Sequence, residues 1–200
     1  DIIVTDQLTK SYRDSTVVDH VDLRVPHGCV YGFLGPNGAG KSTTMKMLLS
    51  LVQPTHGEVE ILGRPMNRRT RRELLGQIGS LIEAPPGYVH LTGAENLKLV
   101  QRQLGLDQGQ VDRAVHIVRM QEQLDKKVGN YSLGMKQRLG IAMALARDPR
   151  LLILDEPTNG LDPAGIEEMR DLLRRLADGG VTVMVSSHLL DEIDRMATVM

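Results

Sequence analysis

The chain has 200 residues, a net charge of −1 and 41% hydrophobic residues, so it can bury a full core, and it has no overall charge that would attract nucleic acid or an anionic membrane. It contains no apolar run near the roughly 18 residues that span a bilayer, and its N-terminus lacks a secretory signal pattern. These features predict a cytoplasmic protein that would meet a membrane only through a partner. The single cysteine, Cys29, is predicted to be a core thiol without chemistry of its own.

Short apolar and β-branched alternations at residues 2–4 and 17–25 predict strands of a small antiparallel sheet, separated by a polar connection at 6–15. Residues 59–63 predict a further strand. Tyr12 lies in the polar connection and admits two interpretations. It is either an ordinary half-buried tyrosine, which its position favours, or a platform on which a base stacks.

A glycine-rich stretch at 35–43 fits the pattern G-x-x-x-x-G-K-[ST] at every fixed position, between a strand predicted at 29–34 and a helix predicted at 44–49. Its glycines let consecutive N–H groups and the positive end of the helix dipole face one concavity, which suits phosphate oxygens. Lys41 would reach the β- and γ-phosphates, and Ser42 would offer its hydroxyl to Mg²⁺. The predicted triphosphate-binding loop consists of Gly35, Pro36, Asn37, Gly38, Ala39, Gly40, Lys41, Ser42 and Thr43.

Five arginines at 64–72 form a basic cluster ahead of an apolar segment at 78–82. The cluster has no interleaved aromatic residue, which favours a solvated surface over a nucleic-acid interface. We therefore expect no nucleic-acid partner. Pro85 and Pro86 then predict a stiffened loop.

Thr92 and Glu95 have the spacing of a capping box, and the helix that they begin is predicted to stop at Gly105. A second helix is predicted at 111–118 from apolar residues at i, i+3, i+4 and i+7. Helices cluster between 86 and 146, whereas strands and helices alternate on either side. This pattern predicts a helical subdomain inserted into an α/β fold.

The apolar run at 151–154 predicts a central parallel strand, which ends at Asp155 and Glu156. Ligands bind at the carboxyl ends of such strands. There Asp155 would hold Mg²⁺ through water, and Glu156 would orient and deprotonate an attacking water. A solvated acidic turn is the alternative, which the complete phosphate loop disfavours.

Asp162 is predicted to cap a helix that ends at Gly179. The strand predicted at 181–185 then delivers Ser186, Ser187 and His188 to the same edge of the sheet. From the sequence alone, His188 is equally well interpreted as a catalytic or as a structural residue.

These motifs together resemble the nucleotide-binding domain of an ATP-binding cassette (ABC) transporter over nearly the whole chain. The phosphate loop, Asp155-Glu156, the turn at 159–162 and His188 occur in the family's order. Residues 131–138 read Y-S-L-G-M-K-Q-R and resemble the family's L-S-G-G-Q signature.

The signature departs from the family at three positions, because Tyr131, Leu133 and Met135 replace the usual Leu, Gly and Gln, whereas Ser132 and Gly134 match. A serine before a helix that starts near glycine still supplies a hydroxyl, backbone N–H groups and a positive dipole end for an anion. The resemblance implies that this anion is the γ-phosphate of an ATP bound by a second subunit.

A further departure is Glu83, which stands where the family usually has Gln in the loop before the helical subdomain. Together with the signature, Glu83 resembles the bacitracin-resistance and lantibiotic-immunity branch of ABC exporters. The chain stops at Met200, where the family normally continues, so the resemblance implies that the C-terminal end of the domain is missing.

The resemblance implies an α/β fold with a RecA-like P-loop NTPase core, a small antiparallel β-subdomain and an α-helical subdomain at about 84–146, all within a single ABC ATPase domain at 1–200. It implies that Glu156, His188 and Glu83 are catalytic and that Ser42, Glu83 and Asp155 hold Mg²⁺. Tyr12 would stack on adenine. Besides Tyr12, the implied ATP ligands are the phosphate loop 35–43, Ser132, Gly134 and Asp162.

The implied protein is an ATPase subunit that pairs with a second copy, or with a homologous ABC subunit, around two ATPs. It would drive a separate membrane permease at the inner face of the cell membrane and export, or protect against, an antimicrobial peptide. The alternative is a soluble ABC-type ATPase in DNA repair or translation. Such proteins carry a long inserted coiled coil or two cassettes in one chain, and the sequence has neither.

Overall fold

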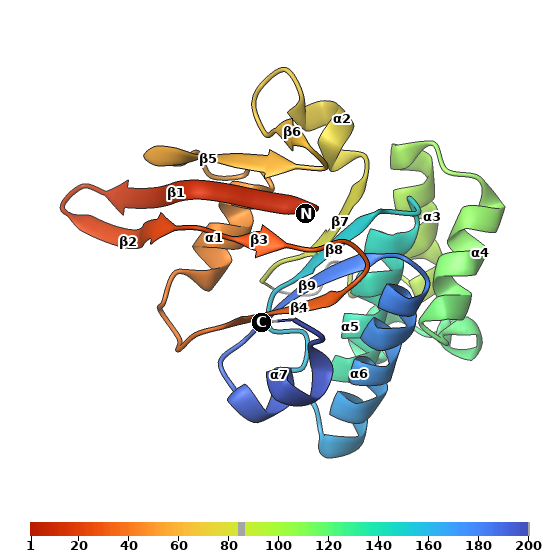
Figure 1. Cartoon of the computed structure of the whole chain (residues 1–200). Coiled ribbons are helices and arrows are strands. Elements are labelled where there is room, and N and C mark those ends of the chain that lie inside the picture. The colour runs from red at the N-terminus through yellow and green to blue at the C-terminus, as the bar shows by residue number, and fades with distance from the viewer. Residues whose placement is uncertain (84–86, 200) are drawn as a thin grey trace.

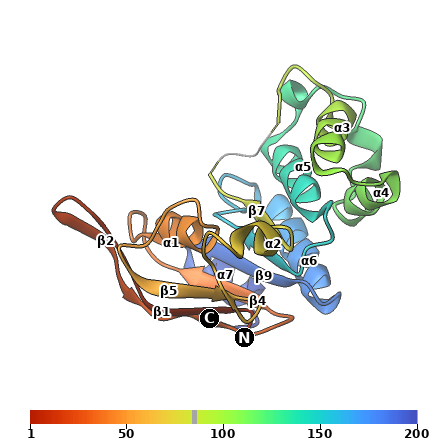
Figure 2. The same ribbon diagram turned by 90° about the horizontal axis from the view of Figure 1, so that it is seen from above.

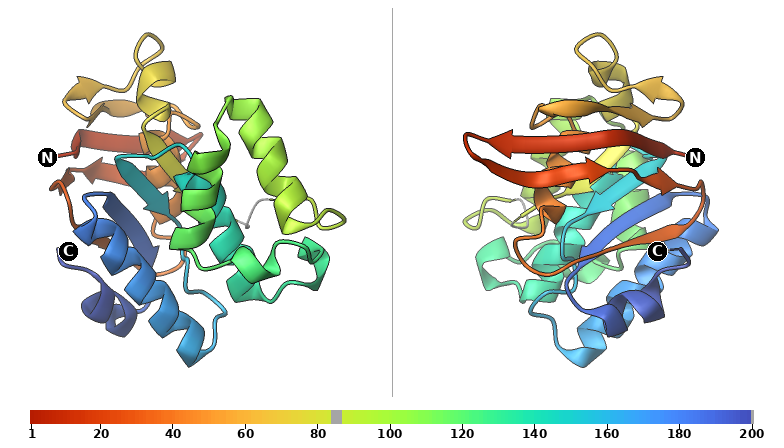
Figure 3. Two further views of the ribbon diagram at one scale, coloured as in Figure 1. Left: turned by 90° about the vertical axis from the view of Figure 1, so that its right-hand side faces the viewer. Right: turned by 60° about the vertical axis from the view of Figure 1, so that its left-hand side comes forward.

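A computed structural model describes residues 1–83 and 87–199. It contains a parallel sheet and an antiparallel sheet, with helices on both sides of the parallel sheet (Figure 1). The antiparallel sheet lies at one end of the molecule, and the helices from the middle of the chain lie at the other (Figures 2 and 3). The predicted α/β fold is confirmed.

The parallel sheet has the order β4-β9-β8-β7, so strands far apart in sequence are neighbours. All residues of β8 are buried, which explains why its sequence is a continuous apolar run. Because all the strands run in one direction, the residues after β4, β8 and β9 meet at one edge of the sheet. The strands are β4 (Val30–Leu34), β7 (Ile78–Leu81), β8 (Leu151–Leu154) and β9 (Thr182–Ser187).

The antiparallel sheet has the order β2-β1-β5-β6, and β3 also pairs with β1. The expectation of a polar connection at 6–15 is wrong, because β1 continues to Tyr12 and turns only at Arg13 and Asp14. The backbone of β1 pairs with β2 along one edge and with β5 along the other. Backbone pairing does not depend on whether the side chains are polar, so the strand continues through these polar residues. The strands are β1 (Ile3–Tyr12), β2 (Ser15–Val21), β3 (Arg24–Val25), β5 (His56–Ile61) and β6 (Arg64–Pro65).

Each of the helices α3, α4 and α6 begins at a residue whose side chain accepts a backbone N–H. The predicted capping box of Thr92 and Glu95 is confirmed, and Gly105 ends α3 with φ 65°, a conformation that glycine adopts without strain. The helices are α1 (Lys41–Leu48), α2 (Arg71–Leu75), α3 (Gly93–Leu104), α4 (Gln108–Ile117), α5 (Leu133–Leu145), α6 (Pro163–Asp178) and α7 (Leu190–Met196).

Two hydrophobic cores lie on the two faces of the parallel sheet, because successive side chains of a strand point to opposite faces. Leu152 and Leu154 of β8 pack with residues of α5, α6 and α7. Leu151 and Ile153 pack with α1 and the antiparallel sheet. Both faces of β8 are thus covered, which holds the residues after it in a fixed place.

The helices α3, α4 and α5 pack together beside this sheet, and α5 also contacts β7 (Figure 2). Their grouping as a separate subdomain stays a prediction. The predicted Pro85-Pro86 loop lies outside the described residues. None of the helices in the described part of the chain is long and apolar enough to span a membrane.

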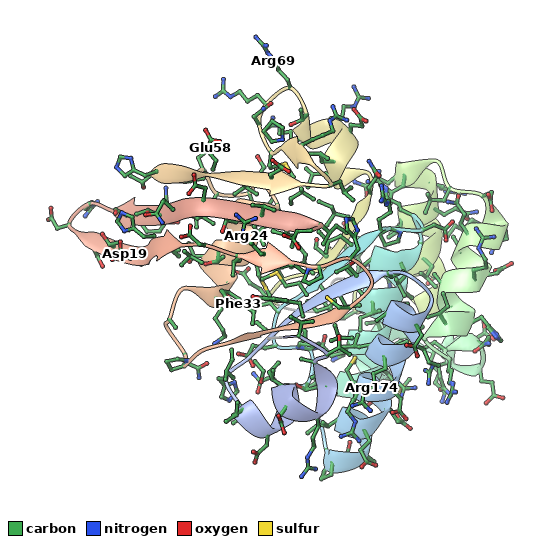
Figure 4. The ribbon with its side chains drawn as sticks, viewed as in Figure 1. Asp19, Arg24, Phe33, Glu58, Arg69 and Arg174 are labelled. Atoms are coloured by element: carbon green, nitrogen blue, oxygen red, sulfur yellow. The ribbon has the colours of Figure 1, made fainter. Side chains whose placement is uncertain are left out.

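Cys29 precedes β4 and is buried at 7% exposure, with its thiol donating to the Pro26 carbonyl oxygen over 3.3 Å. Burial raises the pKa of the Cys29 thiol, which favours the unreactive neutral form. In the basic cluster, Arg64 forms an ion pair with Glu73, whereas Arg69 projects into solvent from the loop before α2 (Figure 4).

Candidate active site

The phosphate loop joins the end of β4 to the start of α1, as its sequence predicts (Figure 1). Gly38 and Gly40 have φ angles of 83° and 86°, a region that other residues rarely adopt. A Cβ atom on Gly40 would also clash with the backbone carbonyl of Val17. The glycine at this position is therefore required both by its backbone conformation and by the close approach of β2.

Lys41, the first residue of α1, is 7% exposed and folds back over the loop. Its Nζ donates to the carbonyl oxygens of Gly35 (2.5 Å) and Pro36 (3.1 Å) and lies 3.3 Å from Oε1 of Glu156. The ammonium group is thus held at the point where the loop and the carboxyl end of β8 meet.

Asp155 follows β8 and lies opposite the start of α1, with only 8% of its surface exposed. Both of its carboxylate oxygens accept hydroxyl hydrogen bonds of 2.5 Å, Oδ2 from Ser42 and Oδ1 from Ser186. These bonds fix the plane of the carboxylate and leave Oδ2 beside the phosphate loop.

Glu156 is the adjacent residue, and its φ of 49° lies in the left-handed region. Its backbone N–H donates to the Ser186 hydroxyl (3.0 Å), and its Oε2 lies 2.8 Å from Nδ1 of His188. Oε1 is buried and has no hydrogen-bond donor among the described residues, although the Lys41 ammonium is near it. The structure thus brings Lys41, Asp155, Glu156 and His188 together.

The donor set of Ser42 and Asp155 fits Mg²⁺, since both offer hard oxygen atoms and their oxygens are already adjacent. The described residues contain no group of three or more His, Cys, Asp or Glu side chains that could hold a metal. Magnesium in nucleotide sites is commonly bound through one or two protein oxygens and otherwise through water and phosphate.

Glu83 lies outside this cluster of contacts, at an exposed position with φ 69° after β7. Its carboxylate forms an ion pair with Lys46 of α1, and this hydrogen bond raises the pKa of the Lys46 ammonium, with smaller contributions from the charges of Glu83 and Asp155. Glu83 is thus joined to α1 through Lys46. A role of Glu83 as a catalytic residue and metal ligand stays a prediction.

Tyr12, at the end of β1, is 50% exposed. The Lys10 ammonium lies 4.8 Å from the centre of the tyrosine ring and also donates to the Gln53 carbonyl oxygen over 2.8 Å. One face of the ring is thus occupied by a cation that is itself anchored. The adenine platform stays a prediction, with the other ring face as the available surface.

Ser132 caps α5, and its hydroxyl accepts the Met135 backbone N–H over 3.2 Å. A cleft of about 530 Å³ lies between the start of α5 and the start of α6, lined by Ser132, Gly134 and Asp162 among others. No hydrogen bond or ion pair of the described residues joins Ser132 or Gly134 to the phosphate loop of this chain. Their roles, and that of Asp162, stay predictions that require a second subunit.

The sequence analysis assigns no role to two residues that contact the predicted site residues, Ser186 and Lys46. The predicted strand at 181–185 brings Ser186 to the correct edge of the sheet. Nothing in the sequence, however, shows that its side chain points at Asp155. Lys46 reads as an ordinary helix-surface lysine, and its pairing with Glu83 joins residues 37 positions apart.

A sequence profile described as ABC transporter matches residues 18–159. The bacitracin transport ATP-binding protein BcrA of Bacillus licheniformis is 49% identical over 98% of this chain and 64% of its own length. The lantibiotic transport ATP-binding protein SrtF of Streptococcus pyogenes is 45% identical over 95% of this chain and 81% of its own length.

Among solved structures, cbiO1 from Clostridium perfringens, part of the ABC transporter complex cbiONQ, superimposes with a TM-score of 0.89 at 27% identity, over 98% of this chain and 82% of that protein. The chain spans about two thirds of the length of the BcrA relatives, 64% and 65%. With a profile match over more than half of the chain and relatives close to half identical, the chain belongs to the ABC transporter family, whose ATP-binding domains hydrolyse ATP.

Proposed function

We propose that the chain is the ATP-binding and ATP-hydrolysing domain of an ABC transporter. The observation that carries the proposal is that four functional groups from two separate segments lie together. The start of α1 contributes the Lys41 ammonium and the Ser42 hydroxyl, and the residues after β8 contribute the carboxylates of Asp155 and Glu156. A phosphate cradle, a metal-binding carboxylate and a partly buried base are groups that serve phosphoryl transfer to water.

In this function the phosphate loop binds the triphosphate through its backbone N–H groups, and Lys41 exchanges its loop carbonyls for phosphate oxygens. Ser42 and Asp155 would hold Mg²⁺, which neutralises phosphate charge when bound. Glu156 accepts the proton of the attacking water. His188, in contact with Oε2 of Glu156, orients that carboxylate. Tyr12 stacks on adenine from the ring face away from Lys10.

The domain acts as a pair, with Ser132, Gly134 and Asp162 of one copy completing the ATP site of the other. A homologous ABC subunit would serve equally as the second member. The pair drives an integral membrane permease, which holds it at the inner face of the cell membrane. The names of BcrA and SrtF support an exported or repelled antimicrobial peptide as substrate. These names also favour a transporter subunit over the alternative, a soluble ATPase of DNA repair or translation.

The test uses the full-length protein, purified with and without the membrane protein that co-purifies with it. We expect Mg²⁺-dependent ATP hydrolysis that increases in the complex, and resistance to a bacitracin- or lantibiotic-type peptide in cells that express both. If the protein hydrolyses ATP but no membrane protein co-purifies with it and the cells gain no resistance to the peptide, the soluble alternative would be supported. Absence of ATP binding would contradict the proposal as a whole.

Glu83 gives a prediction of its own. Replacing Glu83 by glutamine removes the charge that faces Lys46 but keeps the length of the side chain. If Glu83 helps to hold Mg²⁺, the hydrolysis rate of Glu83→Gln should depend on Mg²⁺ concentration differently from that of the parent, while ATP binding stays the same. Glu83→Ala should lose more activity, because the oxygen ligand is absent.

The control for this prediction is Lys46→Met, which breaks the same ion pair from the other side and leaves Glu83 in place. Hydrolysis rates are measured across Mg²⁺ concentrations with the membrane partner present. Identical Mg²⁺ curves for the parent and Glu83→Gln would show that Glu83 is only a partner of Lys46.

A further inference from the structure

Ser186 lies at the carboxyl end of β9, one residue beyond the last pairing of this strand with β8. The two strands are parallel, and their register ends with Leu154 opposite Val185, so Asp155 and Ser186 follow side by side. Ser186 is completely buried. A hydroxyl in such a place needs partners inside the protein, because an unsatisfied buried polar group is costly.

The Ser186 hydroxyl makes two hydrogen bonds, one to each of two adjacent acidic residues. It donates its proton to Oδ1 of Asp155 (2.5 Å) and accepts the backbone N–H of Glu156 (3.0 Å). A hydroxyl has one donor and two acceptor sites, so the two bonds are compatible. With Oδ1 held by Ser186, only Oδ2 of Asp155 remains on the side of Ser42 and the phosphate loop.

The bond to the Glu156 backbone matters because Glu156 has a left-handed conformation, with φ 49°. For a residue other than glycine this conformation is unfavourable and persists only where surrounding contacts hold it. The same conformation places the side chain between Lys41 and His188. Losing the bond would remove one of the contacts that hold the backbone of Glu156, and with it the position of the carboxylate.

We propose that Ser186 is a positioning residue, whose hydroxyl holds the carboxylate of Asp155 and the backbone of Glu156 in one fixed arrangement. The inference rests on the proposed ATP hydrolysis and adds a residue to it. Ser186 acts through its two neighbours and not by contact with nucleotide, as groups behind metal ligands commonly do.

The test compares the full-length protein with its Ser186→Ala variant in two assays. One measures the rate of ATP hydrolysis, and the other measures the Mg²⁺ concentration at which a fluorescent ATP analogue is half-maximally bound. We expect the hydrolysis rate to fall by about 10–100-fold and the required Mg²⁺ concentration to rise by a similar factor. Binding of the analogue without Mg²⁺ should not change. Ser186→Thr keeps the hydroxyl and should restore most of both losses.

Thr182→Ala is the matched control, because Thr182 is a buried hydroxyl residue at the opposite end of the same strand. Its Oγ1 accepts the Gly28 backbone N–H over 2.9 Å, far along the strand from the acidic residues. The melting temperature of Thr182→Ala should fall by about as much as that of Ser186→Ala. Its hydrolysis rate and its dependence on Mg²⁺ should stay those of the parent.

A Ser186→Ala protein that hydrolyses ATP and responds to Mg²⁺ like the Thr182→Ala control would overturn the inference and leave the proposed function intact. A Ser186→Thr protein that melts like the parent but is as inactive as Ser186→Ala would also overturn it. A parent protein that neither binds the analogue nor hydrolyses ATP would instead overturn the proposed function and, with it, the role of Ser186.

Discussion

Replacing Glu156 by glutamine is expected to slow ATP hydrolysis by about 10²–10⁴-fold and to leave ATP binding intact. The amide has the shape of the carboxylate and can keep a contact with His188, but it cannot accept a proton from water. The phosphate loop and the Ser42–Asp155 pair remain unchanged. ATP should then be bound without being consumed, and the variant should elute as a dimer in size-exclusion chromatography with ATP and Mg²⁺.

The control for this variant is Glu58→Gln, which makes the same chemical change at an exposed residue of β5 (Figure 4). It should hydrolyse ATP at the parent rate. A Glu156→Gln protein with parent-like turnover would show that another group is the base. A monomer at saturating ATP and Mg²⁺ would contradict the paired arrangement.

Replacing Ser132 by arginine is expected to abolish hydrolysis without weakening ATP binding to the single chain, because Ser132 would act on the nucleotide of the opposite subunit. Lys41→Ala should also abolish hydrolysis, but for the opposite reason, because it damages the phosphate loop and leaves the signature intact. Mixing equal amounts of the two inactive proteins should restore roughly a quarter of the parent rate, since half of the random pairs are mixed and each holds one complete site.

Ser132 also caps α5, so Ser132→Arg could lower stability by about 0.5–2 kcal/mol through loss of the cap. Ser132→Asp separates the two effects, because aspartate is an equally good cap but repels a γ-phosphate. It should melt like the parent and still fail to hydrolyse ATP. An active Ser132→Asp protein, or a mixture that shows no recovery, would show that the signature does not act across subunits.

The sequence was sufficient for the parts of the site where local geometry determines the residue type. Gly40 has to be glycine because of its φ angle and the nearby Val17 backbone, and this need is visible as a motif. Similarly, β8 is buried on both faces, so its apolar run and the acidic residues after it could be assigned to the centre of a parallel sheet.

The parts that the sequence did not predict depend on contacts between distant segments. The polar residues after Asp6 predicted a loop, but β1 continues because its backbone groups pair with two neighbouring strands, and this pairing is independent of side-chain polarity. The role of Ser186 depends on the register between β8 and β9, and the partner of Glu83 depends on where α1 lies relative to the chain after β7. These relations have no local signal in the chain.

The burial of Cys29 also makes the protein convenient for chemical labelling. Thiol reagents attack the thiolate, and a buried thiol with a raised pKa supplies little of it at neutral pH. Within residues 1–200, a cysteine introduced at an exposed residue such as Leu133, next to Ser132 at the start of α5, would therefore be the thiol that reacts. Spectroscopic probes and crosslinkers can then test the proposed contact between two copies without removal of the native thiol beside β4.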